Sequence, residues 1–373
     1  MNSSTTDVPT LMSADSWRDA ALRHRARVDE LIGDYLAARR RGATHPVIDF
    51  LFTYYPYRPV LLQRWHPGFG VVLAEGPERS HPYAEQRGYE RVDGGVTVSR
   101  AYLRKRSTTI AYTGELLSAT ASRPARLGCF GLHEWAMVYG AGSAASGPNV
   151  TGAGSAASGP NVTGAGSAAS GPNVTGAGSA ASGPNVTGAG SAASGPNVTG
   201  AGSAASGPNV TGGGSVAAPR HSVPLRLGAV GTDEVVESMS LQCTHYDAFR
   251  FFTEPAVGRN AAELTRASQV DREQPGCLHA SMDLYRLAAK LMPLLDSDLL
   301  LRTFELAYAA REIDMRASPY DLRAYGYRPI AIETAAGRAE YVRAQTVVAE
   351  QGSRLRTELL HHISQLRSAM SHP

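Results

Sequence analysis

The sequence lacks the features by which membrane, secreted and nucleotide-binding proteins are usually identified. It contains no run of 18 consecutive apolar residues and no basic start followed by an apolar stretch, so neither a membrane span nor an export signal is predicted. The chain has three cysteines, Cys129, Cys243 and Cys277, and no CxxC pair, which favours a reducing compartment over a disulfide framework. Phosphate loops of the GxxxxGK[ST] kind, GxSxG elbows and HExxH motifs are also absent. We therefore expect a cytoplasmic protein with no membrane partner and no nucleotide cofactor.

Lysine is almost absent, and the net charge is small. Lys105 and Lys290 are the only lysines beside 34 arginines, and the formal net charge is +3 at pH 7. Because arginine is preferred along the whole chain, this usage indicates GC-rich coding DNA more than selection for phosphate contacts. The charge balance predicts no concentrated basic face, although it leaves double-stranded DNA open as a partner.

A low-complexity segment interrupts the chain. Residues 140–211 are six identical copies of the 12-residue unit GAGSAASGPNVT, which carries no charge and no aromatic residue. Such units bury too little apolar area to offset the entropy of ordering, and a stacking repeat needs a hydrophobic face in every unit. We therefore predict a disordered insertion over residues 140–219 rather than a solenoid.

The rest of the chain has the composition of a folded protein. Without the 72 repeat residues, 301 residues remain and contain all the charged side chains, a charged fraction of about a quarter that is ordinary for a globular domain. We expect one helical domain in two halves, residues 13–139 and 220–373, behind a flexible tail of residues 1–12.

Helical spacing of apolar residues dominates both halves. The fold class is mainly α, with a few short strands. Glycine and proline end most of the predicted segments. We predict helices over residues 13–41, 46–54, 61–65, 96–122, 246–253, 273–295, 297–317 and 336–370, and short strands at 71–73 and 330–332, with 223–228 as a strand or an extended approach to a turn.

Histidines lie next to carboxylates in the foldable part of the sequence. On a helix, residues i and i+4 project from one face and can present an imidazole and a carboxylate to one point. Zinc, iron and manganese accept such donors, and two helices that contribute one pair each would nearly complete a coordination shell. The alternative is that each pair forms an ordinary structural hydrogen bond. The candidate metal ligands are His45 and Asp49, His133, His245 and Asp247, and His279 and Asp283.

Glu134 is a candidate for acid or base catalysis without a metal. It is flanked by Phe130 and Trp135, and partial burial beside them would hold its pKa above the usual range. The same burial would suit a structural glutamate.

Two other segments are candidates for ligand contacts. Asp314 and Arg316 belong to a polar segment, residues 311–322, in which they could orient a ligand or could cap a helix and pair with each other. The aromatic residues between Phe50 and Trp65 could stack a planar ligand such as a nucleobase. Their spacing is equally typical of a core.

Three segments resemble a family of actinobacterial proteins commonly labelled 3-methyladenine DNA glycosylase. They are SRPARLGCFGLHEWAMVY at residues 122–139, QPGCLHASMDLY at 274–285 and DMRASPYD at 314–321, within a similarity that runs from about residue 45 to residue 366 without the repeats. The resemblance implies hydrolysis of the N-glycosidic bond of an alkylated purine after base flipping, with an aromatic pocket and a carboxylate that aids attack by water. Glu134 and Asp314 would be the catalytic carboxylates, and the substrate-binding candidates are Tyr55, Trp65, Trp135, Arg316 and Tyr320.

Two hypotheses of other classes stand beside this one. The first is a metal-dependent enzyme that acts on a small molecule through the histidine and carboxylate pairs. The second is a non-enzymatic interaction protein in which the repeats are a spacer. A glycosylase should bind DNA with a steep salt dependence, a metalloenzyme should hold stoichiometric zinc, iron or manganese, and an interaction protein should do neither.

Overall fold

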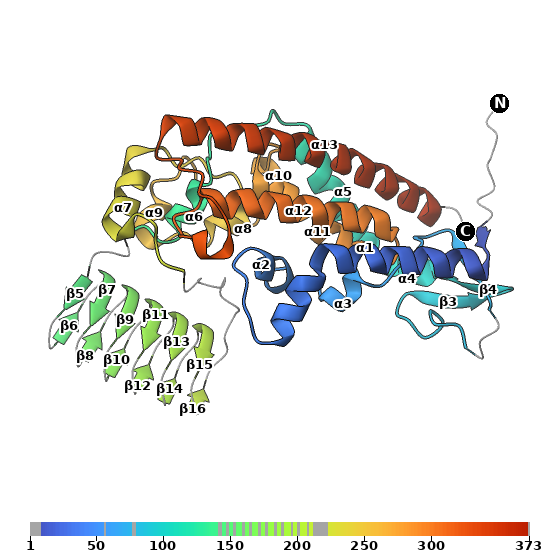
Figure 1. Cartoon of the computed structure of the whole chain (residues 1–373), viewed down its shortest axis with the longest axis horizontal. Helices are drawn as coiled ribbons and strands as arrows, with labels where there is room; N and C mark the ends of the chain where they lie inside the picture. Colours follow the sequence, from blue (N-terminus) through green and yellow to red (C-terminus); the bar gives the residue numbers. More distant parts are fainter. Residues whose placement is uncertain are drawn as a thin grey trace. The chain divides into compact units, whose positions relative to one another are not determined.

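The structure is a computed structural model in which the protein is mainly helical. It describes residues 9–140 and 223–371 except Pro56 and residues 77–79, and between residues 141 and 222 it describes the backbone of short strands. The described residues form thirteen α-helices, one short 3-10 helix and, outside the repeats, a four-stranded sheet (Figure 1). The predicted mainly helical class is therefore confirmed. Among the described residues, no helix combines the length and the hydropathy needed to cross a lipid bilayer.

The chain divides into two compact units, each discontinuous in sequence. The first unit comprises residues 1–130, 265–315 and 334–373, and the second comprises residues 131–264 and 316–333. The boundaries of these units differ from the two predicted halves, residues 13–139 and 220–373, and the single domain expected from the sequence stays a prediction.

Helices of the first unit begin where the sequence supplies caps. The hydroxyl of Ser13 accepts a hydrogen bond from the backbone N–H of Ser16 at the start of α1, and Ser99 caps α4 in the same way. Pro59 stands at the start of α3, where a missing N–H costs nothing. The helices of this unit are α1 (Ala14–Arg40), α2 (Ile48–Thr53), α3 (Pro59–Leu62), α4 (Arg100–Lys105), α5 (Ser107–Ala121), α10 (Gln269–Arg272), α11 (Leu278–Leu291), α12 (Ser297–Ala317) and α13 (Ala335–Ser371).

A small sheet lies in the same unit. Its strands are β1 (Thr10–Met12), β2 (Val71–Ala74), β3 (Tyr89–Val92) and β4 (Gly95–Val98), in the order β1-β2-β4-β3, with β1 parallel to β2 and the other pairs antiparallel. Gly95 allows the close approach of β4 to β2, because an added Cβ would lie 2.1 Å from the carbonyl oxygen of Leu73. Residues 10–12 were expected in a flexible tail, and their backbone pairing with β2 corrects that prediction; residues 1–8 lie outside the described residues.

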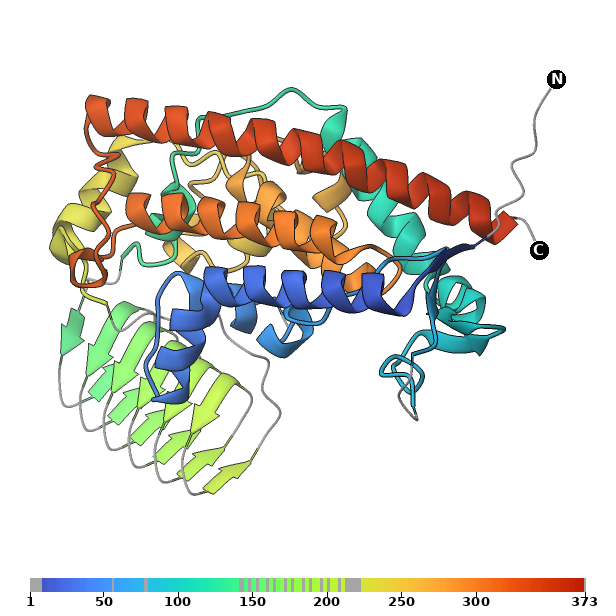
Figure 2. The same cartoon turned by 45° about the vertical axis from the view of Figure 1, so that its right-hand side comes forward.

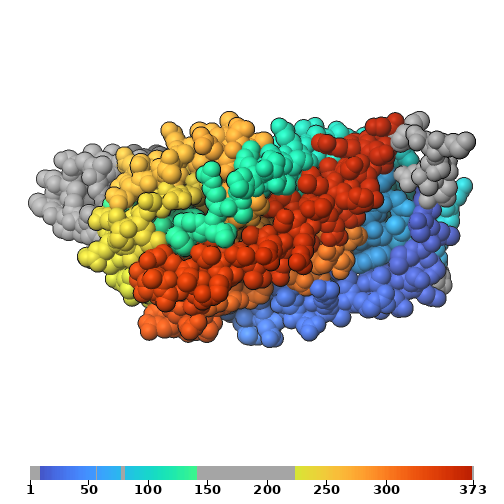
Figure 3. Space-filling view, turned by 90° about the horizontal axis from the view of Figure 1, so that it is seen from above, coloured from blue at the N-terminus to red at the C-terminus, as the bar shows by residue number. Residues whose placement is uncertain are grey.

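Close packing against α13 positions α11 and α5. A Cβ at Gly352 of α13 would lie 2.7 Å from the hydroxyl oxygen of Ser281 on α11, and a Cβ at Gly114 of α5 would lie 3.1 Å from Ile363 of α13. Figure 3 shows α5 beside α13 on the surface. Figures 1 and 2 show α12 alongside α13, and Arg302 of α12 donates two hydrogen bonds to the Glu358 carboxylate of α13, at 2.7 and 2.5 Å.

Several predicted boundaries were wrong for identifiable reasons. The helix expected over residues 96–122 begins only at Arg100, because Val96–Val98 pair as part of β4. The helix expected over residues 273–295 is shorter, since Gly276 packs against the backbone of Arg126, where a Cβ would lie 2.7 Å from its carbonyl oxygen. By contrast, the predictions over residues 13–41, 297–317 and 336–370 correspond closely to α1, α12 and α13.

The second unit contains shorter helices around a buried tryptophan. They are α6 (Leu132–Ala136), α7 (Gly228–Ser238), α8 (Tyr246–Phe249), α9 (Glu254–Val257) and the 3-10 helix η1 (Arg323–Tyr325). Left-handed backbone at Phe130 and Gly131 turns the chain into α6. Residues 330–332 were predicted as a strand, but they form none; their isoleucines are buried in irregular backbone, and Ile330 N–H donates to the carbonyl of Arg316.

Within the insertion, the structure describes the backbone of short strands. Each repeat contributes two strands, and the same residue of successive repeats pairs in parallel, for example Val162 with Val174. Backbone pairing between identical units, rather than a hydrophobic face in each unit, therefore accounts for the strands. One six-stranded sheet contains β5 (Ala144–Ser146), β7 (Gly154–Ser158), β9 (Gly166–Ser170), β11 (Gly178–Ser182), β13 (Gly190–Ser194) and β15 (Gly202–Ser206), and the other contains β6 (Asn149–Thr151), β8 (Asn161–Thr163), β10 (Asn173–Thr175), β12 (Asn185–Thr187), β14 (Asn197–Thr199) and β16 (Asn209–Thr211).

Candidate metal centre

Helix α11 carries two buried polar side chains one turn apart. His279 and Asp283 are 4% and 1% exposed, and their i,i+4 spacing places them on one face of the helix. Helix α11 begins at Leu278, so His279 and Asp283 fall in its first two turns. The sequence singled out this pair, and the structure places each member in a different group of possible metal ligands.

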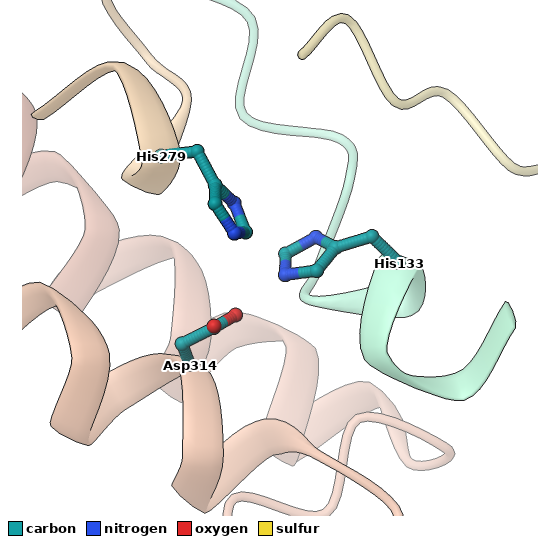
Figure 4. Close-up of side chains that lie close together, drawn as sticks. All are labelled: His133, His279 and Asp314. Carbon is teal, nitrogen blue, oxygen red and sulfur yellow. The ribbon is translucent and has the colours of Figure 1, made fainter. Parts of the chain in front are cut away.

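The first group consists of His133, His279 and Asp314. Each offers one ligand atom, the three atoms lie within 4.8 Å of one another, and all three side chains are buried. Figure 4 shows the two imidazoles and the carboxylate directed toward one another. His133 and His279 were predicted as metal ligands, whereas Asp314 was predicted as a catalytic carboxylate.

A buried arginine holds the Asp314 carboxylate in place. Arg311 lies one turn earlier on α12, is 2% exposed and donates from Nη1 to Asp314 Oδ2 at 2.6 Å. Its guanidinium also lies over the ring of Phe50, 4.1 Å from the centroid. The hydrogen bond from Arg311 fixes the orientation of this carboxylate.

The second group consists of His245, Glu273 and Asp283. Its ligand atoms also lie within 4.8 Å of one another, and all three residues are buried. Glu273 follows α10, and its two carboxylate oxygens accept hydrogen bonds from Thr120 Oγ1 at 3.2 Å and from Gln269 Nε2 at 3.0 Å. Such hydrogen bonds are typical of carboxylates that bind metal, since they fix the orientation of the ligand.

Asp283 has a tyrosine and an arginine as neighbours. Tyr55 OH donates to Asp283 Oδ1 at 3.1 Å, and Arg286 donates to Oδ2. Burial, reinforced by the Asp283 charge, raises the pKa of Tyr55 well above its usual value, so the phenol keeps its proton and remains a donor. Tyr55 was predicted to contact substrate; in the structure its hydroxyl donates to Asp283, and the predicted role stays a prediction.

Arg356 of α13 is a buried guanidinium near Glu273. It is 1% exposed, and its Nη2 donates to the carbonyl of Ala280 at 3.4 Å, while Nε and Nη1 have no hydrogen-bond partner in the structure. Burial lowers the pKa of Arg356, and the negative charge of Glu273 opposes that shift.

Buried carboxylates outnumber buried arginines among the described side chains. Five of the buried residues are acidic and two are arginines. Arg286 and Arg250, which are less buried, pair with Asp283 and Asp247. The acidic residues are Glu134, Asp247, Glu273, Asp283 and Asp314, and the arginines are Arg311 and Arg356.

His45 and Asp49 belong to neither group, although they have the same spacing as the pair on α11 and were also predicted as metal ligands. His45 Nδ1 accepts hydrogen bonds from the N–H groups of Val47 and Ile48, and Asp49 accepts from the N–H of His45 at 2.7 Å and from Tyr35 OH at 2.8 Å. These bonds satisfy backbone donors at the start of α2. In the structure this pair therefore accepts hydrogen bonds from backbone N–H groups at and just before the start of α2, and its predicted role in metal binding stays a prediction.

Two other predicted acidic residues are also outside both groups. Asp247 is buried in the first turn of α8, with Arg250 Nε 3.5 Å from Oδ1. Glu134 is buried next to His133 on α6. The roles predicted for both residues stay predictions.

The remaining predicted substrate contacts have separate surroundings. Trp135 is fully buried; its Nε1 donates to the carbonyl of Ala317, and Arg226 lies over its ring at 5.0 Å. Trp65 packs against the cluster formed by Trp17, Leu73, Tyr83 and Val96 in the first unit. Arg316 Nε donates to the carbonyl of Arg328, and Tyr320 is buried and pairs through its backbone with Leu225.

Sequence reasoning missed Glu273 as a possible ligand and Arg311 and Arg356 as buried charges. Arg311 and Asp314 stand three residues apart on a predicted helix, and this spacing could have indicated an ion pair. Glu273 was predicted at the start of a helix over residues 273–295, but it lies before α11, at the end of α10, and no histidine stands near it in the sequence to indicate a ligand. A comparison of the chain with models of protein families, with curated proteins and with solved structures finds no match in any of the three. The glycosylase resemblance therefore stays a prediction.

Proposed function

We propose that this protein is a metal-dependent enzyme that acts on a small molecule, with the metal held by His133, His279 and Asp314. The observation that carries the proposal is the grouping of two imidazoles and one carboxylate, all buried, within 4.8 Å. Zinc, iron and manganese accept this donor set, and three protein ligands leave coordination positions for water or substrate. When bound, such an ion would supply a Lewis acid or an activated water.

The chain's own residues support this assignment. Arg311 orients the Asp314 carboxylate, and its stacking on Phe50 fixes the guanidinium itself. Such support determines how precisely a ligand is held. Asp314 is fully buried, and its carboxylate supplies an anionic oxygen of the kind that a divalent cation binds.

Elemental analysis of purified protein tests the proposal directly. Protein prepared without a histidine tag should contain zinc, iron or manganese close to stoichiometry, and His279→Ala should lose most of it. His45→Ala is the matched control, because His45 also has an aspartate four residues later but caps α2. Wild-type protein without metal, also after incubation with each of the three ions, would contradict the proposal, and so would equal metal contents in the two variants.

The second candidate function is excision of alkylated purines from DNA. The resemblance of residues 122–139, 274–285 and 314–321 to the glycosylase-labelled family supports it, together with the buried carboxylates Glu134 and Asp314. Release of free 3-methyladenine from methylated duplex DNA, measured with and without EDTA, would distinguish the two. Release that persists in EDTA and is lost in Glu134→Gln would favour the glycosylase.

A further inference from the structure

We infer that His245, Glu273 and Asp283 form a second metal site, so that α11 carries a two-metal centre. This inference rests on the proposed function, because it takes the ion at His133, His279 and Asp314 as the first of the two. The three residues are buried, and their ligand atoms lie within 4.8 Å of one another. They form a mixed set of one imidazole and two carboxylates, richer in oxygen than the first group, which suits manganese or iron better than zinc.

Helix α11 connects the two sites. His279 belongs to the first group and Asp283 to the second, and residues four apart on a helix have Cβ atoms only about 6 Å apart. Two ions bound by neighbouring turns are close enough to share a bridging water or substrate atom, as in two-metal enzymes. By their spacing alone, His279 and Asp283 could bind one ion together; in this arrangement each would bind a different ion.

Hydrogen bonds orient the two carboxylates of the second group. Tyr55 and Arg286 donate to the two oxygens of Asp283, and Thr120 and Gln269 donate to those of Glu273. Such hydrogen bonds determine how precisely a carboxylate is held for binding a metal.

The Glu273→Gln variant is designed to remove a ligand without disturbing the fold. Gln269 Oε1 is buried and has no hydrogen-bond partner in the structure. If the Gln269 amide turns over, this oxygen can accept a hydrogen bond from the new amide at position 273, and Thr120 can still donate to the other atom. Thermal unfolding of the metal-free variant checks that the fold is retained.

Manganese binding tests the second site. Metal-free, untagged protein is dialysed against Mn(II) alone, and bound Mn(II) is counted by elemental analysis. We expect two equivalents in the wild type, one in Glu273→Gln, one in Asp314→Asn, and two in the control Asp49→Asn. Low-temperature EPR of the wild type should show exchange-coupled Mn(II), and both single-site variants should show isolated Mn(II).

The outcomes separate this inference from the proposed function. One equivalent in the wild type that Glu273→Gln leaves unchanged would remove the second site and keep the first. Two equivalents without exchange coupling would overturn the two-metal centre. No Mn(II), zinc or iron bound to the wild type would remove both proposals.

Discussion

The buried pair of Arg311 and Asp314 gives the sharpest prediction about stability. The two side chains are 2% and 0% exposed and are joined at 2.6 Å, so Asp314→Asn leaves a guanidinium in the interior without its neutralising carboxylate. Removing one partner of such a pair costs about 3–5 kcal/mol. Urea unfolding of metal-free protein in EDTA should therefore show a loss of this size in the free energy of unfolding, with no contribution from lost metal.

A double-mutant cycle separates the charge effect from the loss of shape. Arg311→Met combined with Asp314→Leu removes both charges, and the double variant should be within about 1–2 kcal/mol of the wild type, because apolar replacement of a buried pair is often neutral or stabilising. Asp298→Asn is the control on the same helix, where the pair with Arg302 is exposed and worth at most about 1 kcal/mol. A cost below about 1 kcal/mol for Asp314→Asn, or a double variant as unstable as the two single changes added together, would refute the reasoning.

Three more predictions concern the hydrogen bonds of His45, the bound metal, and the ion pair of Arg226 and Glu333. His45→Ala should lower the free energy of unfolding by about 1 kcal/mol, as loss of hydrogen bonds at a helix start does, and should leave the metal content unchanged. A loss of metal would instead identify His45 as a metal ligand. Zinc or manganese at a hundredfold excess over its Kd should stabilise the wild type by about 2.7 kcal/mol, a rise in melting temperature of roughly 5 °C, and an equal rise in His279→Ala would contradict the assignment. Burial raises the pKa of Glu333, but the hydrogen bonds from Arg226, at 2.6 and 2.5 Å, a backbone hydrogen bond and the Arg226 charge together outweigh burial and hold the pKa below the usual value. This stabilisation is complete above the unfolded pKa of about 4.3 and is lost as pH falls through the lower folded pKa, so melting curves of Glu333→Gln should lose stability less steeply in acid than those of the wild type.

The sequence predicted the long helices well because their apolar spacing is sustained over many turns. Helices α12 and α13 follow the predicted ranges to within a residue. Strand β4 was missed because Val96–Val98 continue directly into a helical pattern, and only pairing with β2, distant in sequence, makes them a strand. Local pattern cannot show such pairing.

The metal site could be predicted only in part, for a similar reason. His279 and Asp283 share a helix face, so their spacing indicated a site; His45 and Asp49 have the same spacing, but neither group of possible ligands includes them. The two pairs differ in burial and in their neighbours. Tertiary packing brings Asp314 close to His279 and Glu273 close to Asp283, whereas His45 and Asp49 accept hydrogen bonds from backbone N–H groups. The spacing of two residues cannot specify which of these environments the fold supplies.

The resemblance and the metal proposal converge on the same residues. The segments similar to the glycosylase-labelled family, residues 122–139, 274–285 and 314–321, contain four of the six proposed ligands, and Glu273 directly precedes one of them. Whatever reaction that family performs, these segments would supply its polar centre. His279→Ala should therefore abolish either activity, and the response to EDTA then separates them: an ion-dependent reaction stops and recovers with added metal, whereas hydrolysis that depends on carboxylates alone continues.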